Sequence, residues 1–116
     1  MVSINNISNA EHYTWGAGCD GWRLLNRGDL SVIQERIPPG RGEVLHYHSR
    51  ARQLFYVLEG RVEMEIAGEK MQLVPGDSLE IAPMQNHCIT NVSDSDAHFL
   101  VISSPSTTGD RVNLKG

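Results

Sequence analysis

The sequence is poor in the features that mark several classes of protein. Among 116 residues there are only two cysteines, Cys19 and Cys88, which leaves room for one disulfide at most. We interpret them as a reduced pair. No apolar run approaches the roughly 18 residues of a membrane-spanning helix. Basic side chains form no stripe and the net charge is −4. We therefore expect neither a membrane nor a nucleic-acid partner.

A secretion signal is also missing from the first residues. The stretch "MVSINNISNAEHYTW" lacks the order of a basic segment followed by an apolar one. This absence predicts a cytoplasmic location. The length suits one domain with a core of its own. Hydrophobic residues make up 40% of the chain and charged residues 21%, as in globular rather than disordered proteins.

No long stretch has a convincing helical stripe, whereas strand patterns run through most of the chain. In residues 62–66, "VEMEI", the apolar side chains alternate with glutamates and so share one face. Glycine, proline and Ser-Asp turns separate the runs, which predicts an all-β sandwich or barrel. The predicted strands cover residues 30–37, 43–48, 53–60, 61–66, 69–74, 77–82, 87–92 and 98–103.

Three segments are expected along the chain. Residues 30–104 contain the predicted strands and should form the barrel. Residues 1–29 hold both tryptophans around a glycine-rich "GAGCDG". They are predicted to be an arm that packs on the barrel or on a second subunit. Residues 105–116 are polar and are predicted to be a loose or crossing tail.

The stretch "HYHSRARQ" contains the main candidate for a functional site. His46 and His48 alternate on one predicted strand, so their side chains project to the same face. Gln53 opens the next strand and His87 begins a later one. If the sheet rolls into a barrel, the four side chains converge as ligands of one divalent ion. The alternative interpretation is a polar stripe on the surface.

Two longer patterns resemble the motifs of the cupin superfamily. "PGRGEVLHYHSRARQLFYVLEG" is similar to the first motif, in which a glycine, the H-x-H pair, a glutamate and a second glycine follow one another at characteristic intervals. Here Gln53 stands in the place of the glutamate. "GDSLEIAPMQNHCITN" is similar to the second motif, with His87 and Asn91 at the expected spacing from Gly76. Ala82 replaces a proline and Met84 a glycine, which predicts a local difference in the turn before His87.

The resemblance implies a small single-domain cupin, a double-stranded β-helix or jelly-roll barrel with one metal inside. It implies His46, His48 and His87 as imidazole ligands and places Gln53 at the fourth ligand position. Imidazole-rich sites accept Zn, Fe, Ni or Mn, and the sequence does not choose among them. Cupins commonly pair, so we expect a homodimer.

Gln53 changes the charge of the predicted site. An amide in place of a carboxylate removes one negative charge from the ligands, which should weaken metal binding and strengthen the ion as a Lewis acid. A neutral ligand set favours an anionic incoming molecule. The competing interpretation is that Gln53 marks a structural or non-catalytic site, and the sequence leaves both open.

Other residues are candidates for the surroundings of the site. Phe55, Val57 and Ile89 share the inward parity and should wall a pocket. His98 is a candidate proton-transfer group, although an outward-facing histidine is the alternative. Gln34 and Arg36 are candidates for the mouth, where Arg36 would suit an anion, and the alternative for Arg36 is a surface or interface arginine. Asn91 is expected to fix a turn.

Three kinds of function fit these observations. The first is a metal-dependent enzyme, for example a dioxygenase, isomerase, cyclase or lyase, acting on a small oxygenated molecule. The second is a non-catalytic cupin that binds a sugar or a small acid. The third is a storage or structural cupin with an incidental metal. The fold and the ligands do not choose among these reactions.

Overall fold

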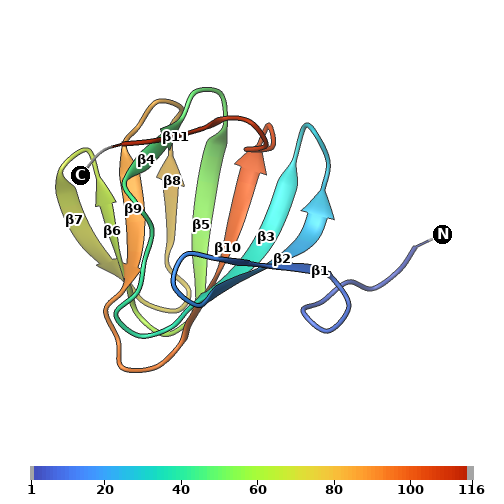
Figure 1. Ribbon diagram of the computed structural model, residues 1–116, viewed down its shortest axis with the longest axis horizontal. Coiled ribbons are helices and arrows are strands. Elements are labelled where there is room, and N and C mark those ends of the chain that lie inside the picture. The colour runs from blue at the N-terminus through green and yellow to red at the C-terminus, as the bar shows by residue number, and fades with distance from the viewer. Residues whose placement is uncertain (1, 115–116) are drawn as a thin grey trace.

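A computed structural model describes residues 2–114, which contain eleven β-strands and no helix. The strands are β1 (Glu11–Trp15), β2 (Cys19–Asn26), β3 (Ser31–Ile37), β4 (His46–His48), β5 (Arg52–Glu59), β6 (Val62–Ile66), β7 (Glu69–Leu73), β8 (Ser78–Ile81), β9 (His87–Asn91), β10 (Ala97–Ser104) and β11 (Arg111–Asn113). They form a six-stranded sheet in the order β1-β2-β3-β10-β5-β8 and a five-stranded sheet in the order β11-β4-β9-β6-β7. The two antiparallel sheets curve around a common interior (Figure 1). The predicted jelly-roll barrel is confirmed.

Alternation of buried and less buried side chains explains why these segments are strands. In β6, Val62, Met64 and Ile66 are buried, and the glutamates between them are only partly covered. In β10, Phe99 and Val101 follow the same rule. One face of each of these two strands is therefore removed from water, which helps to fix the register of its sheet.

The eight predicted strands are all present, with bounds that differ by a few residues. Three further strands, β1, β2 and β11, were not predicted. Residues 11–26 of the segment assigned to an arm form β1 and β2, which continue the larger sheet beyond β3. In the segment assigned to a tail, β11 pairs with β4. Among the described residues, Cys19 and Cys88 are both free, and no helical segment has the length and apolar character needed to span a bilayer.

The core lies between the two sheets and is built from both. Phe55 and Phe99 lie on neighbouring strands of the larger sheet, with ring centroids 5.8 Å apart. Met64 and Ile89 face them from the smaller sheet and are fully buried. Such a continuous apolar interior supplies the main driving force for folding. The polar site described below borders this core, because Phe55 belongs to both.

Candidate metal centre

Three histidines from the smaller sheet meet in the interior of the barrel. His46 and His48 lie on β4, and His87, on the adjacent β9, pairs with His46 in register. Each offers one ring nitrogen, and these nitrogens lie within 4.8 Å of one another. All three residues are buried. The structure therefore brings together the three predicted imidazoles in a group that could hold a metal ion.

Backbone carbonyls orient two of the imidazole rings. His46 Nδ1 lies 2.8 Å from the carbonyl oxygen of Val44, and His87 Nδ1 lies 2.9 Å from that of Gln85. Because a carbonyl oxygen only accepts, each Nδ1 must carry the proton. The Nε2 atoms of His46 and His87 are then left with free lone pairs. This is the usual way in which a protein fixes the tautomer of a metal-binding histidine.

Burial keeps the imidazoles neutral. Loss of hydration lowers the pKa of His46 to about 3 and that of His87 to about 4, from an ordinary value of 6.5. The pKa of His48 is also lowered, again by burial. A metal ion competes with protons for imidazole nitrogen. At neutral pH these three nitrogens are free of that competition.

Gln53 faces the histidines from the other sheet. It lies on β5, where it pairs with Ser103 of β10, and its Nε2 donates a hydrogen bond to Ser103 Oγ at 3.2 Å. That contact directs the amide nitrogen away and leaves Oε1 as the free atom. Gln53 is buried and lines the same cavity as His46 and His48. Its side-chain oxygen is thus available as a ligand.

The unsatisfied polar atoms of the described residues show that this donor set fits a metal. Buried polar groups nearly always have a hydrogen-bond partner, so those without one call for an explanation. Four buried side-chain atoms have none: Ser31 Oγ, His48 Nδ1, Gln53 Oε1 and His87 Nε2. Three of the four belong to the predicted ligands. A metal ion bound by three imidazoles and one amide oxygen would explain why these buried nitrogen and oxygen atoms have no hydrogen-bond partner.

The turn before His87 supports two of the ligands. The N–H group of Met84 donates to the carbonyl oxygen of His48 at 2.7 Å, and Gln85 holds the ring of His87. Met84 has a φ of 71°, in the left-handed region that favours glycine. The backbone here has the conformation that a glycine adopts readily, although the residue is methionine.

The carboxylate of Asp110 secures the loop that follows His48. It accepts hydrogen bonds from the backbone N–H groups of Ser49, Arg50 and Ala51 at 3.1, 3.0 and 2.9 Å. Burial opposes ionisation of Asp110, but these hydrogen bonds outweigh it and lower the pKa of the carboxyl group. The chain before β11 is thereby attached to the strand that carries His46 and His48.

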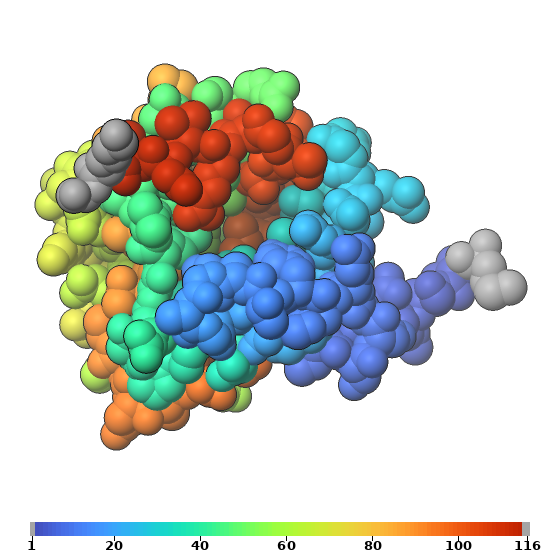
Figure 2. Space-filling model, in the orientation of Figure 1, coloured from blue at the N-terminus to red at the C-terminus, as the bar shows by residue number. Residues whose placement is uncertain are grey.

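A cavity of about 380 Å³ opens beside the histidines. Its mouth lies between the β1–β2 hairpin and the carboxy-terminal segment, where the surface is hollowed (Figure 2). One side is apolar, with Trp15, Ile33, Phe55 and Val101, and the volume suits a small molecule. Phe55 walls the cavity as predicted. Val57 and Ile89 also belong to the hydrophobic core but do not line the cavity.

Two glutamates line this cavity, and neither was predicted. Glu35 projects inward from β3 and accepts a hydrogen bond from the hydroxyl of Tyr13 at 3.3 Å. Burial, reinforced by the charge of Glu43, raises the pKa of Glu35. Glu43 precedes β4, and its side chain is only 7% exposed. Burial also raises the pKa of Glu43, and Arg111 and the N–H group of Ile89 offset this only in part.

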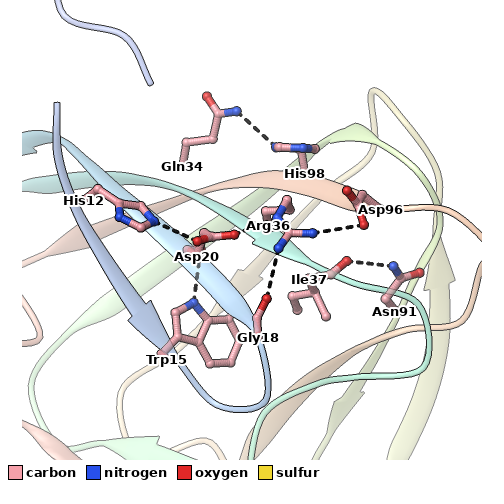
Figure 3. Close-up of polar contacts among 10 residues, drawn as sticks. All are labelled: His12, Trp15, Gly18, Asp20, Gln34, Arg36, Ile37, Asn91, Asp96 and His98. Carbon is pink, nitrogen blue, oxygen red and sulfur yellow. Dashed lines mark hydrogen bonds and ion pairs between the residues drawn. The ribbon is translucent and has the colours of Figure 1, made fainter. Parts of the chain in front are cut away.

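The predicted mouth residues Gln34 and Arg36 lie on the opposite face of β3, so that prediction is wrong. Ile33 and Glu35 point into the cavity, and Gln34 and Arg36, which alternate with them, point outward. Arg36 forms ion pairs with Asp20 at 2.6 Å and Asp96 at 3.0 Å (Figure 3).

His98 also lies on this outer face, which makes the outward-facing alternative the right one. Gln34 Nε2 lies 3.3 Å from His98 Nδ1 (Figure 3), and Trp22 stacks on the His98 ring with centroids 6.2 Å apart. Asn91 fixes a turn as predicted. Its Nδ2 donates to the carbonyl oxygens of Ile37 and Ser95, both at 2.8 Å.

One of the missed residues could have been found from the sequence. Ser31, Ile33, Glu35 and Ile37 alternate, so the two isoleucines define the inward face and put Glu35 on it. A charged residue at an inward position is uncommon and marks a candidate site. Glu43 and Arg111 carry no such signal, because one precedes a strand of three residues and the other lies in an exposed one.

Comparison with known sequences and structures agrees with the fold. The family described as Cupin domain matches residues 33–103, which is more than half of the chain. An uncharacterized protein of Methanocaldococcus jannaschii is 32% identical over 75 residues, covering 65% of this chain and 60% of that protein. Quercetin 2,3-dioxygenase of Bacillus subtilis is 39% identical over 54 residues, covering 47% of this chain and 16% of the enzyme. The chain thus spans less than two thirds of the length of these relatives.

Among solved structures, KdgF from Halomonas sp. is similar over almost the whole chain. The TM-score is 0.83 at 24% sequence identity, and the match covers 91% of this chain and 96% of KdgF. At this level of identity the likeness concerns the fold alone.

Proposed function

This chain belongs to the cupin family, and we propose that it binds one divalent transition metal and uses it to act on a small oxygenated molecule. The proposed ligands are His46, His48, Gln53 and His87. The observation that carries the proposal is the convergence of three neutral, buried imidazoles beside a cavity that opens to the surface. Zn, Fe, Ni and Mn all suit such ligands. When bound, the ion would act as a Lewis acid on an oxygen atom of the substrate.

The remaining residues of the cavity have separate tasks in this proposal. Trp15, Phe55 and Val101 exclude water from one side of the bound molecule. Arg111 lines the opposite part of the cavity and would receive an anionic group. Glu35, hydrogen-bonded to Tyr13, can hold or release a proton close to neutral pH because its pKa is raised. These features favour a small organic acid or sugar acid over a neutral molecule.

The relatives support an enzyme without fixing the reaction. One matched relative is a quercetin 2,3-dioxygenase, and a sugar phosphate isomerase from Silicibacter pomeroyi has the same fold, with a TM-score of 0.77 at 21% identity. Oxygenase and isomerase chemistry are therefore the first reactions to test. The non-catalytic alternative is a cupin that binds the same kind of molecule without converting it.

The test compares metal-loaded and chelator-treated protein against a panel of sugar acids, hydroxy acids and flavonols. We expect one class of compound to raise the melting temperature only when metal is present, and that class to be consumed or isomerised. Oxygen uptake separates oxygenase from isomerase chemistry. Stabilisation without turnover would favour the binding alternative. The same stabilisation in chelator-treated protein would contradict a role for the metal.

We also propose that the chain forms a homodimer in the cytoplasm. The outer face of the larger sheet carries apolar side chains in contact with solvent, including Tyr56, which is 38% exposed, and Leu58, which is 41% exposed. A second copy would cover them. Multi-angle light scattering at micromolar concentration should give twice the mass of the chain. A monomeric mass would overturn the proposal.

A further inference from the structure

The metal centre proposed above contains no carboxylate among its ligands, although one lies beside it. The Oε2 atom of Glu43 is 3.9 Å from His46 Nε2, the nitrogen that carries the free lone pair. Two atoms that each lie about 2.1 Å from one ion are about 3.0 Å apart at a right angle and about 4.2 Å apart on opposite sides. The observed separation falls within this range. A cation bound to His46 Nε2 would thus have the Glu43 carboxylate beside it, although Glu43 lies outside the group of three histidines whose nitrogens are within 4.8 Å of one another.

The contact between Glu43 and His46 is not a hydrogen bond. The proton of the His46 ring is on Nδ1, where it is donated to Val44, so Nε2 has no hydrogen to give. A negative oxygen and a lone pair facing each other across 3.9 Å repel unless something positive lies between them. Arg111 forms an ion pair with the same carboxylate oxygen, with its Nη1 atom 3.7 Å from Glu43 Oε2, and offsets part of this negative charge.

The backbone around Glu43 holds its carboxylate in this position. Gly42 forms a bridge with Thr90, and a Cβ atom at position 42 would lie 2.5 Å from the carbonyl oxygen of Ile89. Only glycine at position 42 lets this segment approach β9 so closely. The N–H group of Glu43 then donates to Ile89 O at 2.9 Å, and the N–H group of Ile89 donates to Glu43 Oε1 at 3.2 Å. Oε1 is thereby anchored, and Oε2 faces His46 Nε2.

We propose that Glu43 supplies the carboxylate of the metal centre, in place of the one that Gln53 lacks. This inference rests on the proposed metal binding by the three histidines. A divalent ion held by three neutral imidazoles and an amide keeps both of its positive charges. The carboxylate of Glu43 cancels one of them, which restores the charge that a glutamate at position 53 would give. Glu43 therefore offsets part of the charge of the ion from a segment of the chain other than the strand that carries Gln53.

The test is the affinity of chelator-treated protein for Zn²⁺, measured by competition with a chromophoric chelator. Replacing Glu43→Gln should weaken binding about 10–100-fold, the range found when a group supporting a metal site is lost. Glu69→Gln is the control, because it makes the same change at an exposed position on β7 outside the cavity, and it should change the affinity by less than about threefold. His87→Ala should lose binding in either case.

A charge exchange makes the test specific. The double variant Glu43→Gln with Gln53→Glu moves the carboxylate to the position where the family has it, and it should recover the affinity lost in Glu43→Gln alone. If wild-type protein binds Zn²⁺ and Glu43→Gln binds it equally well, the inference is wrong while the proposed function stands. If wild-type protein binds no metal, both fail.

A second variant keeps the inference testable if Glu43→Gln does not fold. Glu43→Asp retains the carboxylate but withdraws it by one methylene group. Loaded with Co²⁺, it should show a visible absorption spectrum that differs from that of wild-type protein. Its affinity for the metal should be weaker than that of wild-type protein and stronger than that of His87→Ala. An unchanged spectrum and affinity would overturn the role of Glu43.

Discussion

At the scale of single residues, the interior holds more ionisable groups than its histidines alone. Glu35 and Glu43 both line the cavity, and burial raises the pKa of each. The three imidazoles are affected in the opposite sense, since burial lowers the pKa of each and keeps them neutral. The cavity thus combines neutral imidazoles with carboxyl groups of raised pKa, and both kinds of group can bind a cation. Groups with displaced pKa values collect at functional sites.

Glu35 gives a prediction about stability and pH in metal-free protein. Its pKa in the folded state is raised above the ordinary 4.5. As pH rises above 4.5, the unfolded state releases a proton that the folded state retains, so the free energy of unfolding falls. Glu35→Gln removes this term, and the pH slope should become less negative by at most about 1.4 kcal/mol per pH unit. Urea unfolding at pH 5, 6, 7 and 8 measures the slope.

Glu69→Gln is the control for this experiment, because Glu69 is exposed on β7. It should leave the slope as it is in wild-type protein. If the free energy of unfolding has the same pH slope in wild type and Glu35→Gln, the surroundings of Glu35 do not raise its pKa.

At the scale of elements, eight of the eleven strands in the described residues could be predicted, and the short connections around the site could not. Residues 62–66 alternate strictly, and alternation survives wherever one face of a strand is buried. The hairpin of β1 and β2 was missed because the segment around the glycine-rich "GAGCDG" was predicted to be an arm, and β11 was missed because three exposed residues show no period. His46, His48 and His87 were predicted from strand parity and motif spacing together. Glu43 lies outside a named strand and is placed by Gly42, which no periodicity reveals.

The turn before His87 provides a prediction at this scale. Met84 has a left-handed φ, which costs an ordinary residue roughly 1–2 kcal/mol. Met84→Gly should relieve that strain, and the greater freedom of glycine in the unfolded chain offsets part of the gain. We expect a net increase of roughly 0.5–1 kcal/mol in the free energy of unfolding. Chemical denaturation of the two proteins measures the difference.

Met84→Ala separates strain from the loss of the side chain. Alanine keeps the Cβ atom that disfavours a positive φ, and the methionine side chain is largely exposed. This variant should therefore gain nothing. If alanine stabilises the protein as much as glycine does, the backbone conformation of residue 84 is not the cause.

At the scale of the whole molecule, the candidate centre joins the two sheets of the barrel. The three histidines belong to the five-stranded sheet, whereas Gln53 and Glu35 belong to the six-stranded sheet. The carboxy-terminal segment and the β1–β2 hairpin close the cavity from two sides (Figure 2). An ion bound to both sheets would stabilise the folded state through the linkage of binding and folding. Metal binding is thus expected to be a property of the assembled barrel.

The most direct test of this account is the binding of Zn²⁺ to chelator-treated protein, measured by isothermal titration calorimetry. We predict one ion per chain for wild type, binding weaker by more than about 100-fold for His87→Ala, and no change for His98→Ala, whose histidine lies on the outer face of the same barrel. Absence of binding by wild-type protein, or equal binding by His87→Ala, would contradict the account.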